Sequence, residues 1–308
     1  MLNAQWELID LRVFVCVARR SSFNAAAVEL GISPAYVSKR ILGLEKALGI
    51  SLFHRTTRRV SITDEGETAL LWARKVLDTA DSLTQEVGRT RATPSGTLRI
   101  STSLRLGRNH VGHILARLKL QYPELDIWLE LVDRRVDVLG EGFDIDIRVG
   151  DISEPYLVAH PVAHSVRVLC AAPAYLARRG VPKTLADLAQ HDCLLFRDRD
   201  QAYGVWRLEG PQGVESVKVT STLGSNHSDA VHNWAVDGHG IVLLSSWDVA
   251  ARLKDGSMQR VLPVYHQQAN VWAVTATRLG NSAKLKVCVD FLVRELTQGA
   301  FALDTVLA

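Results

Sequence analysis

The segment Leu8–Leu48 carries three helical patterns separated by short breaks, and this succession constrains the fold more than any other feature of the sequence. Apolar side chains recur on one helical face from Leu8 to Ala18. Ser22 can cap an alanine-rich second helix, which Gly31 can end because glycine accepts the left-handed backbone of a helix C-terminus. The spacing therefore predicts a compact set of short helices at the start of the chain.

A third helix is expected to begin at Ser33 and Pro34, with serine at the capping position and proline at the first helical position. Two helices joined by a glycine-containing turn, the second with small, hydroxyl and basic side chains, are typical of a helix-turn-helix that binds DNA. Its buried stripe is predicted to consist of Val37, Ile41, Leu44 and Leu48, and its outward face of Tyr36, Ser38, Lys39 and Arg40.

The segments 50–53 and 60–63 read as two short strands around a basic loop, His54–Arg59. Such a loop fits a wing that reaches phosphates or the minor groove of DNA. A solvated run of charge is the alternative for the loop alone. Residues 1–63 hold nine Lys and Arg against four Asp and Glu, whereas the remainder holds 27 against 29, so the positive excess of the +3 chain favours a polyanion partner for this segment.

The sequence over 22–66 resembles the DNA-binding signature of the LysR family of bacterial transcription regulators. The resemblance implies that the start of the third helix enters the major groove, and the base preference stays open because Pro34–Ala35 stands where the family often has Gln-Pro. The matching run is Ser22-Phe23-Asn24-Ala25-Ala26-Ala27, Leu30-Gly31-Ile32-Ser33, Val37-Ser38, Ile41, Leu44-Glu45, Leu48-Gly49, Leu52-Phe53, Arg55 and Thr63-Asp64-Glu65-Gly66. The expected DNA-binding residues are Ser33, Pro34, Ala35, Ser38, Lys39, Arg40, Arg55, Arg58 and Arg59.

A long helix is predicted after Thr63, which can cap it, with Asp64 and Glu65 favourably placed in the first turn. Its apolar residues recur at steps of four and three, as in a coiled-coil seam. An amphipathic helix packed on its own domain is the alternative. The family resemblance implies a homodimer through this helix and, commonly, a homotetramer. The expected seam is Ala69, Ala73, Val76, Ala80, Leu83 and Val87, widened by Leu70, Trp72 and Leu77.

From Thr97 onwards strands and helices alternate, which indicates an α/β domain with largely parallel sheets covered by helices. Ligands bind such sheets beyond the carboxyl ends of their strands. An anion is expected there, held by hydroxyls near a helix N-terminus and by a guanidinium. For each residue taken singly, a turn cap or an internal ion pair is the alternative. The expected effector-binding residues are Ser101, Thr102, Ser103, Arg148, Asn226 and His227.

The LysR resemblance extends to this domain and implies two α/β lobes like those of a periplasmic binding protein, with a small inducer between them. The segments Tyr203–Leu208 and Asn233–Gly240 are similar to the subgroup that regulates D-malate and related hydroxy-acid catabolism, which favours a carboxylate. The expected organisation is a winged helix-turn-helix over 1–63, a linker helix over 64–91 and an effector domain over 92–308, with lobe I about 97–164 and 268–300, lobe II about 165–267, and crossings near 163–166 and 266–270.

Two other classes of protein, an enzyme and a solute-binding module, fit the sequence less well than a regulator. An enzyme is disfavoured, because no G-x-S-x-G, P-loop or HExxH motif is present and the pairs His110/His113 and His160/His164 lack a third metal ligand. A solute-binding module is disfavoured by the basic wing and by the absence of a signal peptide or an apolar span. We therefore expect a cytoplasmic regulator without a cofactor, with buried reduced cysteines, whose partners are double-stranded DNA, an inducer, a second copy and RNA polymerase.

Overall fold

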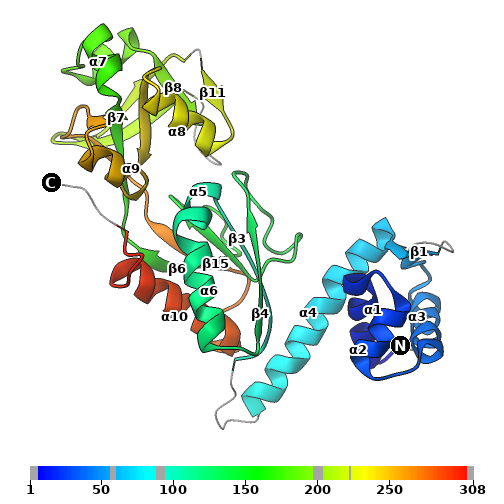
Figure 1. Cartoon of the computed structure of the whole chain (residues 1–308). Helices are drawn as coiled ribbons and strands as arrows, with labels where there is room; N and C mark the ends of the chain where they lie inside the picture. The colour runs from blue at the N-terminus through cyan, green and yellow to red at the C-terminus, as the bar shows by residue number, and fades with distance from the viewer. Residues whose placement is uncertain (1–5, 56–59, 88–93, 197–203, 222, 304–308) are drawn as a thin grey trace. The chain divides into compact units, whose positions relative to one another are not determined.

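A computed structural model describes residues 6–55, 60–87, 94–196, 204–221 and 223–303 (Figure 1). The chain divides into two compact units, Met1–Ala92 and Thr93–Ala308. Within the described ranges, none of the helices is both long enough and apolar enough to cross a membrane.

The first unit is a helical domain with a two-stranded wing (Figure 1). The predicted caps are confirmed, because the Ser22 hydroxyl accepts a hydrogen bond from the Ala25 amide and the Ser33 hydroxyl accepts one from the Tyr36 amide, both at 3.2 Å. Gly31 ends the second helix with a φ of 65°, in the left-handed region. The elements are α1 (Leu8–Arg20), α2 (Phe23–Leu30), α3 (Pro34–Leu48), β1 (Phe53–Arg55), β2 (Val60–Ile62) and α4 (Asp64–Val87).

The core of the first unit joins the three helices to the wing. The ring of Phe53 lies edge-on to those of Phe14 and Phe23, at centroid distances of 5.5 and 5.8 Å. The predicted stripe of α3 is confirmed at Val37, Ile41 and Leu44, which are fully buried. The prediction is wrong for Leu48, which is 41% exposed because the helix ends there and the core lies behind its earlier turns.

The wing strands are shorter than expected and pair antiparallel, with Phe53 opposite Ile62. The Thr63 hydroxyl accepts a hydrogen bond from the Gly66 amide at 2.9 Å and donates one to the Ser51 carbonyl oxygen at 2.6 Å. The predicted cap is therefore confirmed, and it also fixes the start of α4 to the wing. Arg58, Arg59 and the side chain of Arg55 lie outside the described residues.

Helix α4 packs the first part of its apolar stripe against the core of its own unit, so this part is not available to a partner helix. Two other apolar residues of the helix, Trp72 and Leu83, remain 60% and 63% exposed. The predicted coiled-coil seam is thus corrected over its first half, because a repeat of three and four residues suits an internal core as well as a partner helix. The α4 residues in the core of the first unit are Ala69, Leu70, Ala73, Val76 and Leu77.

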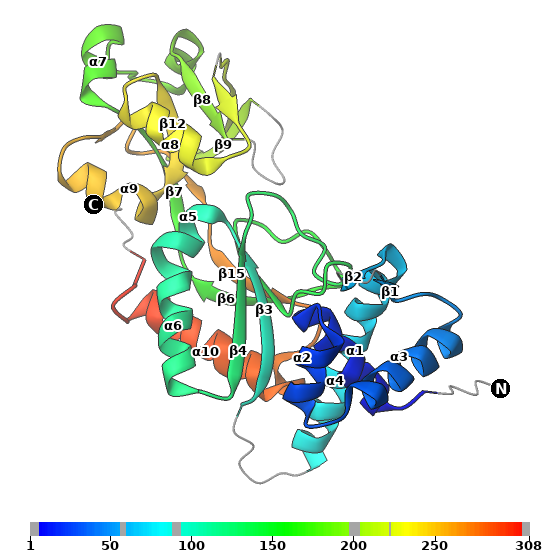
Figure 2. The same ribbon diagram turned by 45° about the vertical axis from the view of Figure 1, so that its right-hand side comes forward.

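The second unit consists of two lobes, each an α/β layer around its own sheet (Figure 2). Lobe I has the sheet order β4-β3-β5-β15-β6, and α6 and α10 pack against the same core. A helix runs without a break from Leu104 to Gln121 through the π-helical turn η1. Its elements are β3 (Gly96–Thr102), α5 (Leu104–Leu106), η1 (Gly107–Val111), α6 (Gly112–Gln121), β4 (Leu125–Leu131), β5 (Ile145–Val149), β6 (Val158–Ala163), β15 (Val271–Thr275), η3 (Leu279–Asn281) and α10 (Ala283–Thr297).

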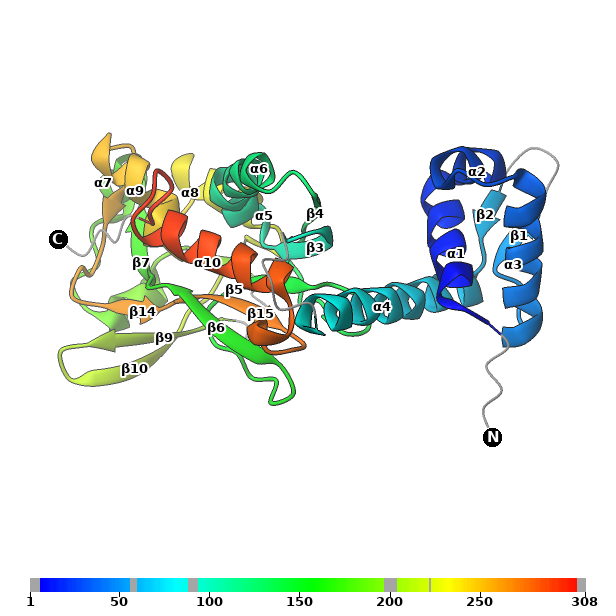
Figure 3. The same ribbon diagram turned by 90° about the horizontal axis from the view of Figure 1, so that it is seen from below.

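Lobe II has the sheet order β10-β9-β14-β7-β12-β8-β11, with the hairpin β9–β10 beside β14 (Figure 3). Its helices α8 and α9 contact β12. Its elements are β7 (Val166–Ala171), α7 (Pro173–Arg179), η2 (Leu185–Gln190), β8 (Cys193–Phe196), β9 (Val205–Gly210), β10 (Gly213–Lys218), β11 (Gly224–Ser225), α8 (Ser228–Val236), β12 (Ile241–Ser245), α9 (Ser246–Lys254), β13 (Gln259–Arg260) and β14 (His266–Gln268).

The expectation of largely parallel sheets is wrong. In the described residues β3 is parallel to β4 and β5, and β8 is parallel to β11 and β12, whereas the other pairings are antiparallel. The sequence pattern did not predict β6, β14 or the hairpin β9–β10, and these strands account for much of the antiparallel pairing.

The chain passes between the lobes twice, at 164–165 and 269–270, and the two crossings lie side by side. The Ala269 amide donates to the Ser165 carbonyl oxygen at 2.9 Å. The Ser165 amide in turn donates to the side-chain oxygen of Asn270 at 3.2 Å. These bonds tie the two crossings into one connection at the base of the lobes.

Candidate functional site: a cavity between the two lobes

A cavity with a volume of about 500 Å³ lies between the lobes of the second unit, with walls drawn from both. A volume of this size suits a small organic ligand. Lobe I contributes Ser103, Arg105, Asp133, Ile147, Arg148, Val149, Gly150 and Asp151. Lobe II contributes Arg167, Phe196, Val205, Arg207, Glu209, Val214, Ser228, Leu243, Leu244, Ser245, Trp247, Asp248, Gln267 and Gln268.

The lobe II wall includes one face of β9. Alternate residues of a strand point to opposite faces, so Trp206 and Leu208 are buried while Arg207 and Glu209 face the cavity. Gln267 of β14 is only 7% exposed. Its amide nitrogen donates to the Arg207 carbonyl oxygen at 3.0 Å, and its oxygen accepts from Arg167 Nη1 at 2.9 Å. This glutamine therefore links three strands of the wall.

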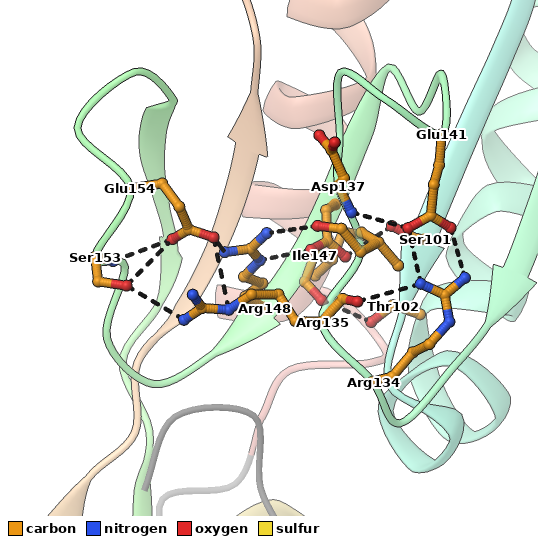
Figure 4. Close-up of polar contacts among 12 residues, drawn as sticks. Ser101, Thr102, Arg134, Arg135, Asp137, Glu141, Ile147, Arg148, Ser153 and Glu154 are labelled. Carbon is orange, nitrogen blue, oxygen red and sulfur yellow. Dashed lines mark hydrogen bonds and ion pairs between the residues drawn. The ribbon is translucent and has the colours of Figure 1, made fainter. Parts of the chain in front are cut away.

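The lobe I wall contains Arg148, which lies among acidic side chains (Figure 4). Its Nε donates to Asp146 at 2.5 Å, and its Nη1 donates to Glu154 at 2.6 Å. Burial alone would lower the pKa of Arg148, but the hydrogen bonds and charges of Asp146 and Glu154 outweigh it and raise the pKa. The guanidinium is 4% exposed and stays charged because both carboxylates compensate it.

Beneath Arg148, two hydroxyls at the end of β3 are fully buried and used internally. Ser101 donates to Asp146 Oδ1 at 2.7 Å, and Thr102 donates to the Ile147 carbonyl oxygen at 3.0 Å (Figure 4). The Ser101 bond fixes Asp146, which in turn accepts the hydrogen bond from Arg148, and the Thr102 bond fixes the backbone between them.

Two residues that line the cavity, Arg105 and Asp248, belong to a group of ion pairs between the lobes. We call this group the interlobe cluster: Arg105 and Arg108 of lobe I with Asp229, His232 and Asp248 of lobe II. Arg105 lies 2.5 Å from Asp229 Oδ1 and 2.6 Å from Asp248 Oδ1. Arg108 lies 2.7 Å from Asp229 Oδ2. The pair of Arg105 and Asp248 is almost completely shielded from solvent, at 10% and 4% side-chain exposure.

Burial and pairing act in opposite directions on the two aspartates of this cluster. Burial alone would raise the pKa of Asp248, but the nearby His232 and Arg105 outweigh it and hold that pKa below its ordinary value. The pKa of Asp229 is lowered in the same way, with burial opposed by Arg105 and Arg108. Both carboxylates are therefore ionised at neutral pH, and the cluster holds the lobes together electrostatically.

In the first unit, the start of α3 presents an exposed surface at Ser33, Pro34, Ala35 and Lys39, and Ser38 is half-buried beside it. Arg40 differs from these residues, because its guanidinium is engaged within the unit. It lies 3.0 Å from Glu7 and 3.2 Å from Asp10, and its Nε donates to the Tyr36 hydroxyl at 2.9 Å.

Two family models match the chain. Residues 8–67 match a bacterial regulatory helix-turn-helix of the lysR family, and residues 91–297 match the LysR substrate binding domain. The chain belongs to the LysR family. It is therefore a LysR-type transcriptional regulator, with a DNA-binding and a substrate-binding domain, and it is not an enzyme.

Named LysR-type relatives cover nearly the whole chain. The HTH-type transcriptional regulator DmlR of Escherichia coli K12 is 47% identical over 92% of this chain and 93% of its own. The HTH-type transcriptional activator TtdR of the same strain is 41% identical over 95% and 94%. The solved structure of CrgA from Neisseria meningitidis matches with a TM-score of 0.58 and 26% identity over 94% of this chain and 98% of that one. The predicted family and the likeness to the subgroup around DmlR are confirmed.

The cavity between the lobes is lined by two of the six predicted effector-binding residues. Ser103 and Arg148 line it. Ser101 and Thr102 are buried behind the wall, and Asn226 and His227 are exposed just before Ser228, which does line it. The predicted effector role of all six residues remains a prediction.

Sequence reasoning overlooked the interlobe cluster and the arginines of lobe II. Arg105 comes two residues after the predicted Ser103, and Asp229 lies in the first turn of a predicted helix, so both were within reach of the pattern. Their pairing spans 124 positions and depends on the tertiary arrangement of the lobes. The histidines that raised the question of a metal have internal contacts: His110 Nδ1 lies 3.3 Å from the Phe301 carbonyl oxygen, and His160 Nε2 lies 3.2 Å from the Thr275 hydroxyl.

Proposed function

We propose that this LysR-type regulator binds operator DNA through its first unit and changes that binding when a small carboxylate occupies the cavity between the lobes. The observation that carries the proposal is the cavity of about 500 Å³, whose walls come from both lobes. The two lobes are connected by one pair of crossings and by the interlobe cluster. A ligand that touches both walls favours one lobe arrangement over another, which is the differential affinity that control requires.

On the DNA side, the exposed start of α3 supports a role for Ser33, Pro34, Ala35, Ser38 and Lys39 at base edges or phosphates. The wing residues Arg55, Arg58 and Arg59 supply positive charge that would neutralise phosphates.

Arg40 takes a different role in this proposal. Its pairs with Glu7 and Asp10 support a role in holding α3 against α1, with the guanidinium near the DNA surface rather than free to read a base.

On the effector side, Arg148 places positive charge and Ser103 a hydroxyl on the lobe I wall, and the arginines that line both walls support an anionic ligand. Ser101 and Thr102 act in this proposal by fixing that wall. Asn226 and His227 precede Ser228, which lines the cavity, so they would contact the ligand after a shift of this loop.

A homodimer, and from it a homotetramer, would form through the outer surface of α4, where Trp72 and Leu83 are exposed. Two reading heads would then match a two-fold symmetric operator in the cytoplasm, and their spacing would control access of RNA polymerase.

The test is fluorescence anisotropy of the full chain with a duplex from the region upstream of its own gene, titrated across salt concentration with an unrelated duplex as competitor. We expect tight, salt-sensitive and competitor-resistant binding that changes when small carboxylates are added. Binding no tighter than to the unrelated duplex would contradict the operator proposal. Specific binding that every carboxylate leaves unchanged would contradict the effector proposal.

A further inference from the structure

We propose that lobe II holds the carboxylate of the effector through Arg207 of β9, and that Arg148 of lobe I does not. The inference rests on the proposed function, because it requires that the cavity binds a small carboxylate. It assigns the anion to a residue of lobe II that was not among the expected effector-binding residues.

The two arginines of the lobe I wall already lie between carboxylates. Arg148 is bonded to Asp146 and Glu154, and Arg105 is paired with Asp229 and Asp248. An added carboxylate beside either guanidinium would meet two negative charges as well as one positive charge. Such a ligand would therefore gain little from either arginine unless the network first broke.

Arg207 is placed differently. It makes no ion pair with any residue of the described ranges, although it lines the cavity and its side chain is exposed. Its acidic neighbour on the same face of β9, Glu209, lies 3.7 Å from His266 Nε2. A carboxylate that entered the cavity would thus be the charge partner that Arg207 lacks among the described residues.

The backbone below Arg207 is held in place, which is what an anion site needs. Its carbonyl oxygen accepts from Gln267, and β9 pairs with both β10 and β14. Arg207 therefore projects from a fixed strand, so part of the cost of ordering it is already met before ligand binds.

Arg167 of β7 also lines the lobe II wall, but it lies on the opposite face of the sheet from Arg207. It lies opposite Gln267 in the register of β7 and β14, and its Nη1 donates to the neutral Gln267 oxygen at 2.9 Å. Glu209, on the same face of β9 as Arg207, is paired with His266, whereas Arg167 is paired with the next residue, Gln267. Because alternate residues of a strand point to opposite faces, the carboxylate is assigned to Arg207 alone.

The opposite wall supplies a group for the remainder of the ligand. Ser103 lines the cavity from lobe I, next to Asp133. A ligand with its carboxylate on Arg207 and a hydroxyl or second acidic group at Ser103 would bridge the lobes. The inferred class is a small organic acid with a second polar group, and its anion is read by lobe II.

Isothermal titration calorimetry of the full chain tests the inference, with pyruvate, succinate and malate as probes and dimethyl succinate as the uncharged counterpart. The variants are Arg207→Gln, which removes the charge, and Arg207→Lys, which keeps it but removes the two-pronged geometry. Arg252→Gln is the matched control, because Arg252 is exposed on α9 and does not line the cavity. Circular dichroism melts would verify that each variant folds.

We expect Arg207→Gln to weaken the carboxylate by about 10- to 100-fold, the loss of a hydrogen bond to a charged group. Arg207→Lys should lose less, Arg252→Gln should match the wild type, and dimethyl succinate should not bind. Equal affinities of wild type and Arg207→Gln would overturn the inference and leave a carboxylate effector standing. Absence of binding by wild type to every probe at millimolar concentration would overturn both.

Discussion

Asp133 of lobe I caps a helix of lobe II at Ser228. Its Oδ2 accepts hydrogen bonds from the Ser228 amide at 2.8 Å and from the Ser228 hydroxyl at 2.7 Å. Its Oδ1 accepts from the Leu104 amide at 3.0 Å, at the start of the long helix of lobe I. One carboxylate thus satisfies the free amides at two helix N-termini, one in each lobe, at the edge of the cavity.

Replacing Asp133 with alanine should therefore loosen both helix starts at once. We expect the second unit to lose about 1–3 kcal/mol of stability, the range for an N-cap and a charged hydrogen bond. Hydrogen exchange should accelerate at the Leu104 and Ser228 amides. Asp126→Ala is the control, because Asp126 is 68% exposed and its pair with Lys119 contributes little. Unchanged exchange at Ser228 would show that the cap between lobes does not form in solution.

The two arginines of the interlobe cluster should differ sharply in their contribution to stability. Arg105→Gln leaves the shielded carboxylate of Asp248 without its main partner and should cost about 3 kcal/mol. Arg108→Gln removes an ion pair whose arginine is 52% exposed and should cost less than about 1 kcal/mol. Urea unfolding of the two variants measures the difference, and similar losses would contradict the assignment of Arg105 as the central pair.

The cluster also predicts how stability depends on pH. Because the pKa of Asp229 is lowered in the folded chain, the folded state binds fewer protons than the unfolded state near the ordinary carboxyl pKa of about 4. The stabilisation is therefore present above that pH and is lost as pH falls through the lowered pKa. We expect the melting temperature of Asp229→Asn to fall less steeply than that of the wild type from neutral to acid pH, and parallel curves would exclude this linkage.

At the DNA surface, two lysines of α3 provide a matched comparison. Lys39 is exposed near the start of the helix, whereas Lys46 is exposed in its last turn. If the start of α3 meets DNA, Lys39→Ala should reduce the slope of log affinity against log salt by about 0.9, and Lys46→Ala should leave it unchanged. Anisotropy titrations at several salt concentrations give both slopes. Equal slopes for the two variants would place the contact elsewhere.

The cysteines should be unreactive while the chain is folded. Cys16, Cys170, Cys193 and Cys288 are all buried thiols. Burial raises the pKa of Cys193 and Cys288 to about 12 and raises the pKa of Cys170 as well. The thiolate is the reactive form, so thiol-reactive dyes should label the native chain very slowly and the urea-unfolded chain rapidly. Rapid native labelling would point to local opening around one of them.

Local signals in the sequence predicted the first unit well. Ser22, Gly31, Ser33 and Thr63 act within a few residues of themselves, and their capping or helix-ending roles are confirmed. The face of α4 could not be assigned in this way, because the same apolar spacing fits an internal core and a second copy. The strand directions of lobe II could not be predicted either, since pairing depends on segments such as β14 that lie far apart in sequence from their partners.

The cavity was predictable in location but not in detail. Ser103 follows β3 and Arg148 lies near the end of β5, and the rule that ligands bind at strand ends placed both on the wall. The rule does not reveal that Arg148 is ion-paired with Asp146 and Glu154. Nor does it reveal that Arg207 lines the lobe II wall from β9, a strand that the sequence pattern did not predict. Charge compensation of this kind depends on which side chains the fold brings within a few ångströms.

The position of β15 has a consequence for the order in which the chain matures during synthesis. This strand lies between β5 and β6 in the sheet of lobe I, although it follows all of lobe II in the sequence. A nascent chain that has just completed β14 already holds every strand of lobe II, while lobe I still lacks an inner strand and α10. The later lobe in sequence is therefore the first that can close, and the lobe joined to the DNA-binding unit waits for the last residues to leave the ribosome.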